Sequence, residues 1–233
     1  MKFRLLTVVL ATSSLFGILG VPSGAALKTA PYAQMRIVIS NADAELSVRV
    51  TTTATMSGMR ILQVTDAGRS AGRQTVALTN AGKSDTIIAE LIAGALYVKG
   101  DATILTTYLA LSQETANELA GQWFGIPKSS GYYAQVAQGL TISTGMAEVT
   151  MTPSVTSSPV VTLAGVKVAV LKGTSVKSAL EASFKETLYL TTANKPLPVE
   201  VTRSVQGSLG KIVFSHWNEK IALVAPKVKL QLN

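Results

Sequence analysis

The residues that could carry catalytic chemistry are few, and the first to consider is the pair Ser215-His216. A serine hydrolase needs a histidine base, an orienting acid and an exposed nucleophile. The Gly-x-Ser-x-Gly turn that presents such a serine does not occur in this sequence. The alternating pattern around Phe214 instead places His216 inside a β-strand, two residues further on. We therefore do not expect this pair to be catalytic.

Other reactive groups are excluded by composition or by spacing. The chain has no cysteine and a single histidine, so a thiol nucleophile, a disulfide framework and a multi-histidine or cysteine metal site are ruled out. Gly82-Lys83-Ser84 resembles the end of a phosphate-binding loop, but Ala77 stands where that motif needs its first glycine. The acidic residues lack the spacing of a calcium loop. We expect no enzyme activity, no metal and no cofactor.

A different kind of site is an apolar cavity, which needs enclosure rather than reactive groups. Each buried methylene is worth about 0.8 kcal/mol, so a protein that carries an acyl chain must keep it from water. Seven apolar or aromatic residues lie in or next to one helical region, and we predict that they line such a cavity. They are Tyr97, Leu105, Tyr108, Leu119, Trp123, Val136 and Leu140. The alternative for each of them is ordinary packing between helix and sheet.

The elements that would position these residues are a sheet, a helical insertion and a second set of strands. Residues 45–99 read as about five antiparallel strands, because apolar and polar residues alternate between turn-rich segments. Residues 100–150 predict three short helices, with Asp101 and Ser112 as N-caps and Glu114 in a first turn. An extended piece at 122–127 carries Trp123 and Phe124.

Strands return after Pro153, at residues 160–163, 166–171 and 183–190. Residues 188–226 predict a meander with a turn at 206–208 and a third run after Asn218. Residues 227–232 alternate and predict a last edge strand. Residues 32–44 fit either a helix or an early strand. The fold class is therefore α+β, with most of the chain in one domain.

The N-terminus predicts export. Lys2 and Arg4 precede an apolar stretch at residues 5–19, and small residues follow for cleavage after Ala25. About 15 apolar residues are few for a membrane span, which needs about 20, although an uncleaved anchor remains the alternative. We expect a signal peptide at 1–25, a leader at 26–34 and one domain at 35–233. Cleavage lowers the net charge from +8 to +6, which suits peripheral contact with anionic lipid or an ordinary basic surface.

Four segments in this order resemble the LppX/LprG family of actinobacterial envelope lipoproteins, which belongs with the LolA and RseB-type lipid-binding fold. They are residues 96–101 (LYVKGD), 119–127 (LAGQWFGIP), 188–201 (LYLTTANKPLPVEV) and 214–226 (FSHWNEKIALVAP). The resemblance implies a curved, half-open antiparallel β-barrel covered by a helical insertion, with an apolar cavity between sheet and helices. Family members bind acylated lipids or glycolipids and move them through the envelope.

One departure from the family concerns the membrane anchor. The family carries a lipid-modified cysteine directly after the signal segment, whereas this sequence has Ser23-Gly24-Ala25-Ala26 there. We therefore expect an exported protein of the cell envelope or the exterior without a lipid anchor. The resemblance implies non-enzymatic binding or transport of acylated lipid or glycolipid. The alternative is an envelope regulator with a protein partner. We expect a monomer. We also expect no nucleic-acid partner, because the positive charge forms no long basic run.

Overall fold

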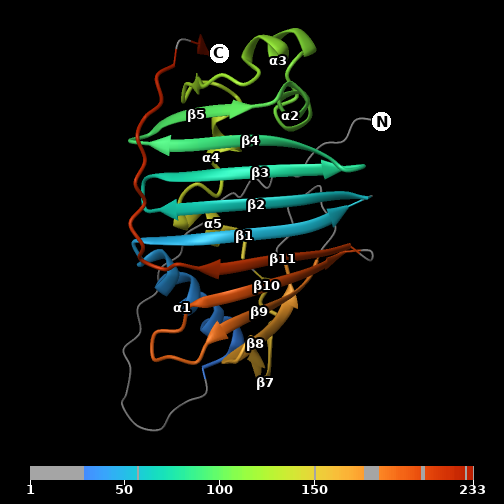
Figure 1. Ribbon diagram of the computed structural model, residues 1–233. Helices are drawn as coiled ribbons and strands as arrows, with labels where there is room; N and C mark the ends of the chain where they lie inside the picture. The colour runs from blue at the N-terminus through green and yellow to red at the C-terminus, as the bar shows by residue number, and fades with distance from the viewer. Residues whose placement is uncertain are drawn as a thin grey trace.

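The computed structural model describes residues 29–56, 58–149, 151–175, 184–205, 208–228 and 230–232. Within these residues, twelve strands form one large open sheet, and five helices pack on the side here called the helix-side face (Figure 1). The α+β class and the antiparallel sheet are confirmed. The predicted signal peptide and residues 206–207 of the predicted turn lie outside the described residues. None of the helices in the described part of the chain is long and apolar enough to span a bilayer.

The strands are β1 (Ser47–Met56), β2 (Met59–Gly68), β3 (Gly72–Asn80), β4 (Lys83–Ile92), β5 (Ala95–Gly100), β6 (Phe124–Ile126), β7 (Thr156–Leu163), β8 (Val166–Thr174), β9 (Lys185–Thr191), β10 (Pro198–Val205), β11 (Ser208–Ser215) and β12 (Leu230–Gln231). Their order in the sheet is β12-β6-β5-β4-β3-β2-β1-β11-β10-β9-β8-β7. The five strands expected in residues 45–99 are confirmed as β1 to β5. A second meander, β7 to β11, joins the first through antiparallel pairing of β1 with β11.

The helices are α1 (Pro31–Asp43), α2 (Ala102–Tyr108), α3 (Gln113–Leu119), α4 (Tyr133–Ala137) and α5 (Ile142–Ala147). Residues 32–44, which fitted either helix or strand, form α1, and its first residue, Pro31, falls within the predicted leader. Proline suits this position because the first helical N–H needs no partner. Helix α1 therefore begins within the segment predicted as the leader.

In the described part of the predicted insertion, four helices, α2 to α5, lie between β5 and β7 in the chain, one more than expected. Ser112 caps α3, because its Oγ accepts the Thr115 N–H at 3.1 Å. Asp101 occupies the N-cap position of α2, but its Oδ2 accepts the N–H of Thr86 on β4 at 3.0 Å instead. It therefore attaches the start of the helix to the sheet. The sequence analysis missed α5, which begins with a capping box at Thr141.

Two predictions at the end of the second meander are wrong. The third run, predicted at residues 221–226, is not a strand, because β11 already pairs with β10 on one side and β1 on the other. This C-terminal segment runs instead across the ends of β1 to β5 and returns to the sheet at β12, which pairs with β6 in parallel (Figure 1). His216 is not in a strand either, because β11 ends at Ser215 and His216 has φ 53°. The edge strand predicted at 227–232 exists as β12.

The two edges of the sheet differ. β12 provides a two-residue edge at one end. At the other end β7 is eight residues long, with Pro159 in its middle and a register shift between Ser158 and Val161. Val160 and Val161 on this strand are exposed.

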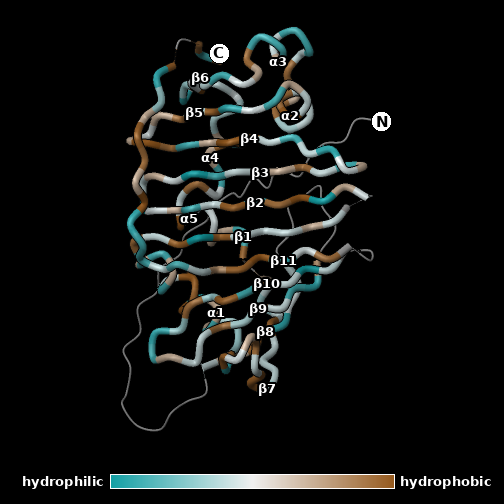
Figure 2. The backbone as a smooth tube through the Cα atoms, viewed as in Figure 1, coloured by the Kyte–Doolittle hydropathy of each residue, from teal (hydrophilic) through white to brown (hydrophobic). Residues whose placement is uncertain are grey.

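Apolar side chains gather on the helix-side face in two clusters. Along the backbone, apolar stretches recur in the central strands β2 and β4 (Figure 2). The first of the two clusters, here called the α2–α4 cluster, joins residues of α2, α3 and α4 to β3, β4, β5 and β6. The second, the α1–α5 cluster, joins α1 and α5 to β8, β9, β10 and β11. Both clusters use the residues of each strand that alternate toward the helices.

Candidate functional site

Five of the seven predicted lining residues meet in one place. Leu105, Leu119, Val136 and Leu140 are buried members of the α2–α4 cluster, and Tyr108 packs against it half-buried. Burial is complete at Leu105 and Leu140, with 0% of each residue exposed. In this structure these side chains pack between helix and sheet. Their contact with a ligand remains a prediction that depends on movement of the helices.

Tyr97 and Trp123 lie elsewhere. Tyr97 sits between Leu96 and Val98 on β5, and both of these neighbours point into the α2–α4 cluster. Because strand residues alternate, Tyr97 faces the opposite side of the sheet. Trp123 is half-buried just before β6 and is not a member of the cluster. The seven residues therefore do not form one surface.

Between the two clusters, the sheet has a row of residues that the sequence analysis did not single out. Successive register pairs place Glu186 of β9, Arg203 of β10, Gly210 of β11, Ala54 of β1 and Ile61 of β2 side by side on the helix-side face. Among the described residues, a Cβ added at Gly210 would meet only Arg203 Cβ at 3.8 Å and the Thr53 carbonyl at 4.0 Å, both ordinary contacts. The middle of this row therefore lacks a large side chain, and there is space above Gly210.

Apolar residues around Gly210 are only half-buried. Ala54 and Val50 on β1, and Met59 and Ile61 on β2, share the helix-side face and retain partial exposure. Met59 and Ile61 touch the α2–α4 cluster, whereas Val50 touches the α1–α5 cluster. Thr52 and its β2 partner Gln63 lie between them on the same face. Together these residues form a mainly apolar surface between the two clusters, here called the central floor.

A polar group lies at one side of the central floor. Arg203 donates from Nε to Glu186 Oε1 and from Nη2 to the backbone carbonyl of Glu148, which follows α5. The Glu186 side chain is 0% exposed, and its second oxygen, Oε2, has no hydrogen-bond partner among the described residues. We call Glu186, Arg203 and Glu148 the buried polar cluster.

Burial controls the protonation of this cluster. Desolvation raises the pKa of Glu186, and the neighbouring Arg203 opposes that shift only in part. Desolvation likewise raises the pKa of Glu148, against Arg203 and a 3.4 Å hydrogen bond from Gln138 Nε2. Burial, with Glu148 nearby, also raises the pKa of Tyr108. One guanidinium therefore faces two carboxyl groups, and the cluster has no surplus positive charge.

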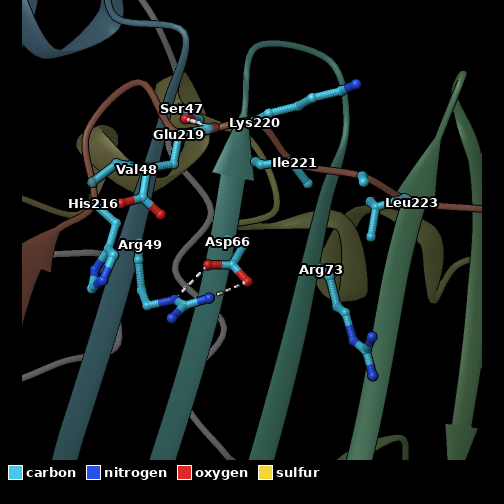
Figure 3. Close-up of a pocket in the computed structure, with 11 residues that line it drawn as sticks. Ser47, Val48, Arg49, Asp66, Arg73, His216, Glu219, Lys220, Ile221 and Leu223 are labelled. Carbon is cyan, nitrogen blue, oxygen red and sulfur yellow. Dashed lines mark hydrogen bonds and ion pairs between the residues drawn. The ribbon is translucent and has the colours of Figure 1, made fainter.

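The opposite face carries a pocket of about 150 Å³ beneath the C-terminal segment (Figure 3). Its arginines are already engaged. Arg49 binds Asp66 through Nε at 2.7 Å and Nη2 at 3.0 Å, and Arg73 Nε lies 3.6 Å from Glu90 Oε1. Ligand pockets usually enclose about 300–1,000 Å³, so this one is small for an acyl chain.

His216 also lines this pocket, and its Nδ1 lies 2.9 Å from Ser215 Oγ. Within the described residues, no carboxylate makes a hydrogen bond to the imidazole that would orient it as in a triad. The described residues also contain no group of three or more potential metal ligands.

The comparisons with known proteins agree on the fold. No family model matches the sequence, and a comparison with curated proteins gives no match. Among solved structures, LprF from Mycobacterium bovis aligns with a TM-score of 0.55 at 11% identity, over 84% of this chain and 96% of that chain. The lipoprotein LppX of Mycobacterium tuberculosis aligns with a TM-score of 0.50 at 12% identity, over 84% of this chain and 98% of LppX. The resemblance to the LppX/LprG family is therefore confirmed for the fold.

Proposed function

We propose that this protein is a non-enzymatic carrier that binds acylated lipid or glycolipid in a bacterial cell envelope. The acyl chain lies along the central floor, between the sheet and the helices of the insertion. The floor suits this ligand because its apolar residues touch both clusters and because Gly210 has no side chain to fill the space above it. The same proposal includes that the protein is exported, that it has no lipid anchor and that it is a monomer.

The observation that carries the proposal is the partial exposure of Val50, Ala54, Met59 and Ile61 at the middle of the sheet. Twelve strands spaced by about 4.8 Å extend across on the order of 50 Å. The helices have 13, 7, 7, 5 and 6 residues, or about 8 to 20 Å at 1.5 Å per residue. The helices are too short to bury a face of that size. An acyl chain on the central floor would cover what they leave open.

The α2–α4 cluster provides a way for the site to enlarge. Its helices contact the sheet mainly through apolar side chains, which have no directional bonds to break when they slide. Polar attachments exist at the margins, where Tyr133 donates from its hydroxyl to the Gly94 carbonyl at 2.8 Å. Movement of these helices would bring Leu105 and Leu119 onto the ligand, as the sequence analysis predicts.

Native mass spectrometry of the protein purified from envelope extracts tests the proposal. A co-purified mass that fragments to acyl chains supports the carrier. Protein that is empty after purification, and stays empty when it is incubated with dispersed lipids, contradicts it. A stable complex with another envelope protein and no acyl mass supports the alternative, a regulator on the same fold.

A further inference from the structure

The buried polar cluster lies where a lipid on the central floor would change from apolar chain to polar group. Arg203 and Glu186 stand in the same register row as Gly210 and Ala54, and the rows beside them carry Val201 and Ile212 of the α1–α5 cluster. On the far side of Gly210, Ile61 leads into the α2–α4 cluster. Polar atoms are therefore flanked by apolar surface in both directions.

The free atom of this cluster is a hydrogen-bond acceptor. Glu186 Oε1 accepts from Arg203, whereas Oε2 is buried without a partner in the described part of the chain. A buried acceptor left unpaired costs about as much as the hydrogen bond it lacks. Because the Glu186 side chain is 0% exposed, a ligand reaches Oε2 only when the groups that cover it move aside. A ligand that then donates a hydroxyl or amide hydrogen would remove that cost.

The charges of the cluster select against an anionic ligand. Arg203 already donates to Glu186 and to the Glu148 carbonyl, and the two carboxyl groups outnumber it. A phosphate would therefore meet carboxylate oxygens without a free cation, in a desolvated site where repulsion is poorly screened.

We propose that the buried polar cluster is a subsite for the hydrogen-bond-donating centre of an uncharged two-chain lipid. One chain extends toward the α2–α4 cluster, the other toward the α1–α5 cluster, and the donor between them binds Glu186 Oε2. This inference rests on the proposed carrier function, and it specifies the ligand as a diacylglycerol-like or ceramide-like lipid rather than a phospholipid.

Three probes with identical chains separate the possibilities. They are 1,2-dioleoylglycerol, its 3-acetate, which lacks the donor, and dioleoyl phosphatidic acid, which carries a phosphate. Competition against an uncharged fluorescent fatty-acid methyl ester at pH 8.5, where Glu186 is more fully ionised, gives their relative affinities for the full chain. We expect dioleoylglycerol to bind about tenfold or more tightly than either of the others, as a hydrogen bond to a charged acceptor implies.

Glu186→Gln keeps an oxygen for Arg203 but replaces the free acceptor by an N–H donor. We expect this variant to lose the preference for dioleoylglycerol over the acetate. Glu200→Gln is the matched control, because Glu200 is a buried carboxylate on the opposite face, paired with Lys211 at 2.7 Å. It should keep the wild-type preference. Thermal unfolding shows whether each variant is folded.

The outcomes distinguish the two proposals. If none of the probes binds the wild-type protein, the carrier function fails and the subsite fails with it. If all three bind equally, or phosphatidic acid binds best, the carrier function stands and the subsite is refuted. An unchanged preference in a folded Glu186→Gln variant also refutes the subsite.

Discussion

Replacing Gly210 by leucine is the sharpest test of the central floor. Gly210 lies on β11 between Arg203 and Ala54, and a Cβ there makes only ordinary contacts, at 3.8 Å and 4.0 Å. Glycine also weakens a strand by roughly 0.5–1 kcal/mol relative to alanine. We therefore expect Gly210→Leu to fold with stability equal to or slightly above that of the wild-type protein.

The effect on binding follows from displaced methylene groups. A leucine side chain brings about four carbon atoms into the space above Gly210, and these exclude about the same number of acyl methylenes. At about 0.8 kcal/mol for each, the loss is about 3 kcal/mol, or on the order of a hundredfold in affinity. A chain that shifts sideways along the floor would lose less, so tenfold is the smallest effect we expect.

Displacement of an uncharged fluorescent fatty-acid methyl ester by dioleoylglycerol measures this loss, with thermal unfolding as the check on folding. Gly131→Leu is the matched control, because Gly131 is exposed between β6 and α4 and a Cβ there has no atom within 4 Å. It should bind as the wild-type protein does. A folded Gly210→Leu variant with wild-type affinity would refute the central floor as the acyl site.

Two predictions concern the packing around the site. Hydrogen bonds from Lys195 and Asn218 lower the pKa of Glu45 in the folded protein. The ionised Glu45 side chain therefore stabilises the fold fully when the pH is above the ordinary pKa of 4.5. This stabilisation is lost as the pH falls through the lower pKa of the folded state. Thermal unfolding should therefore show Glu45→Gln less stable than wild type at pH 7, with the gap closing in acid; a gap independent of pH contradicts this. Leu105→Trp should overpack the α2–α4 cluster and lower the free energy of unfolding by about 1–3 kcal/mol. The control Leu209→Trp, at a residue that is 71% exposed, should change it little. Equal melting temperatures of the two variants would contradict the prediction and show that the helices move easily.

The sheet and the helical insertion were predictable because their signals are local. Alternation of apolar and polar residues predicted β1 to β5, and Ser112, as an N-cap residue, predicted the start of α3. The pairing of β1 with β11 joins residues more than 150 positions apart, such as Arg49 with Ser215, and no local pattern encodes it. This pairing takes the edge that the third run of the meander would need, which is why that run was assigned wrongly.

The site was predictable in part for a similar reason. Leu105, Leu119, Val136 and Leu140 were found together because one insertion carries them all. The buried polar cluster was missed because β9, β10 and the end of α5 bring its residues together only in the fold. A signal existed nonetheless: Glu186 has the same strand parity as Leu188 and Leu190, and Arg203 the same as Val201. A charge on the apolar face of an alternating strand marks such a position.

The unequal edges of the sheet bear on how the protein avoids self-association. Free strand edges template further pairing, and proteins commonly interrupt them. Pro159 has no N–H to donate, and the adjacent register shift breaks the hydrogen-bond ladder of β7. The opposite rim ends in two residues. We therefore expect Pro159 and the register shift to limit the pairing of a further strand beside Val160 and Val161.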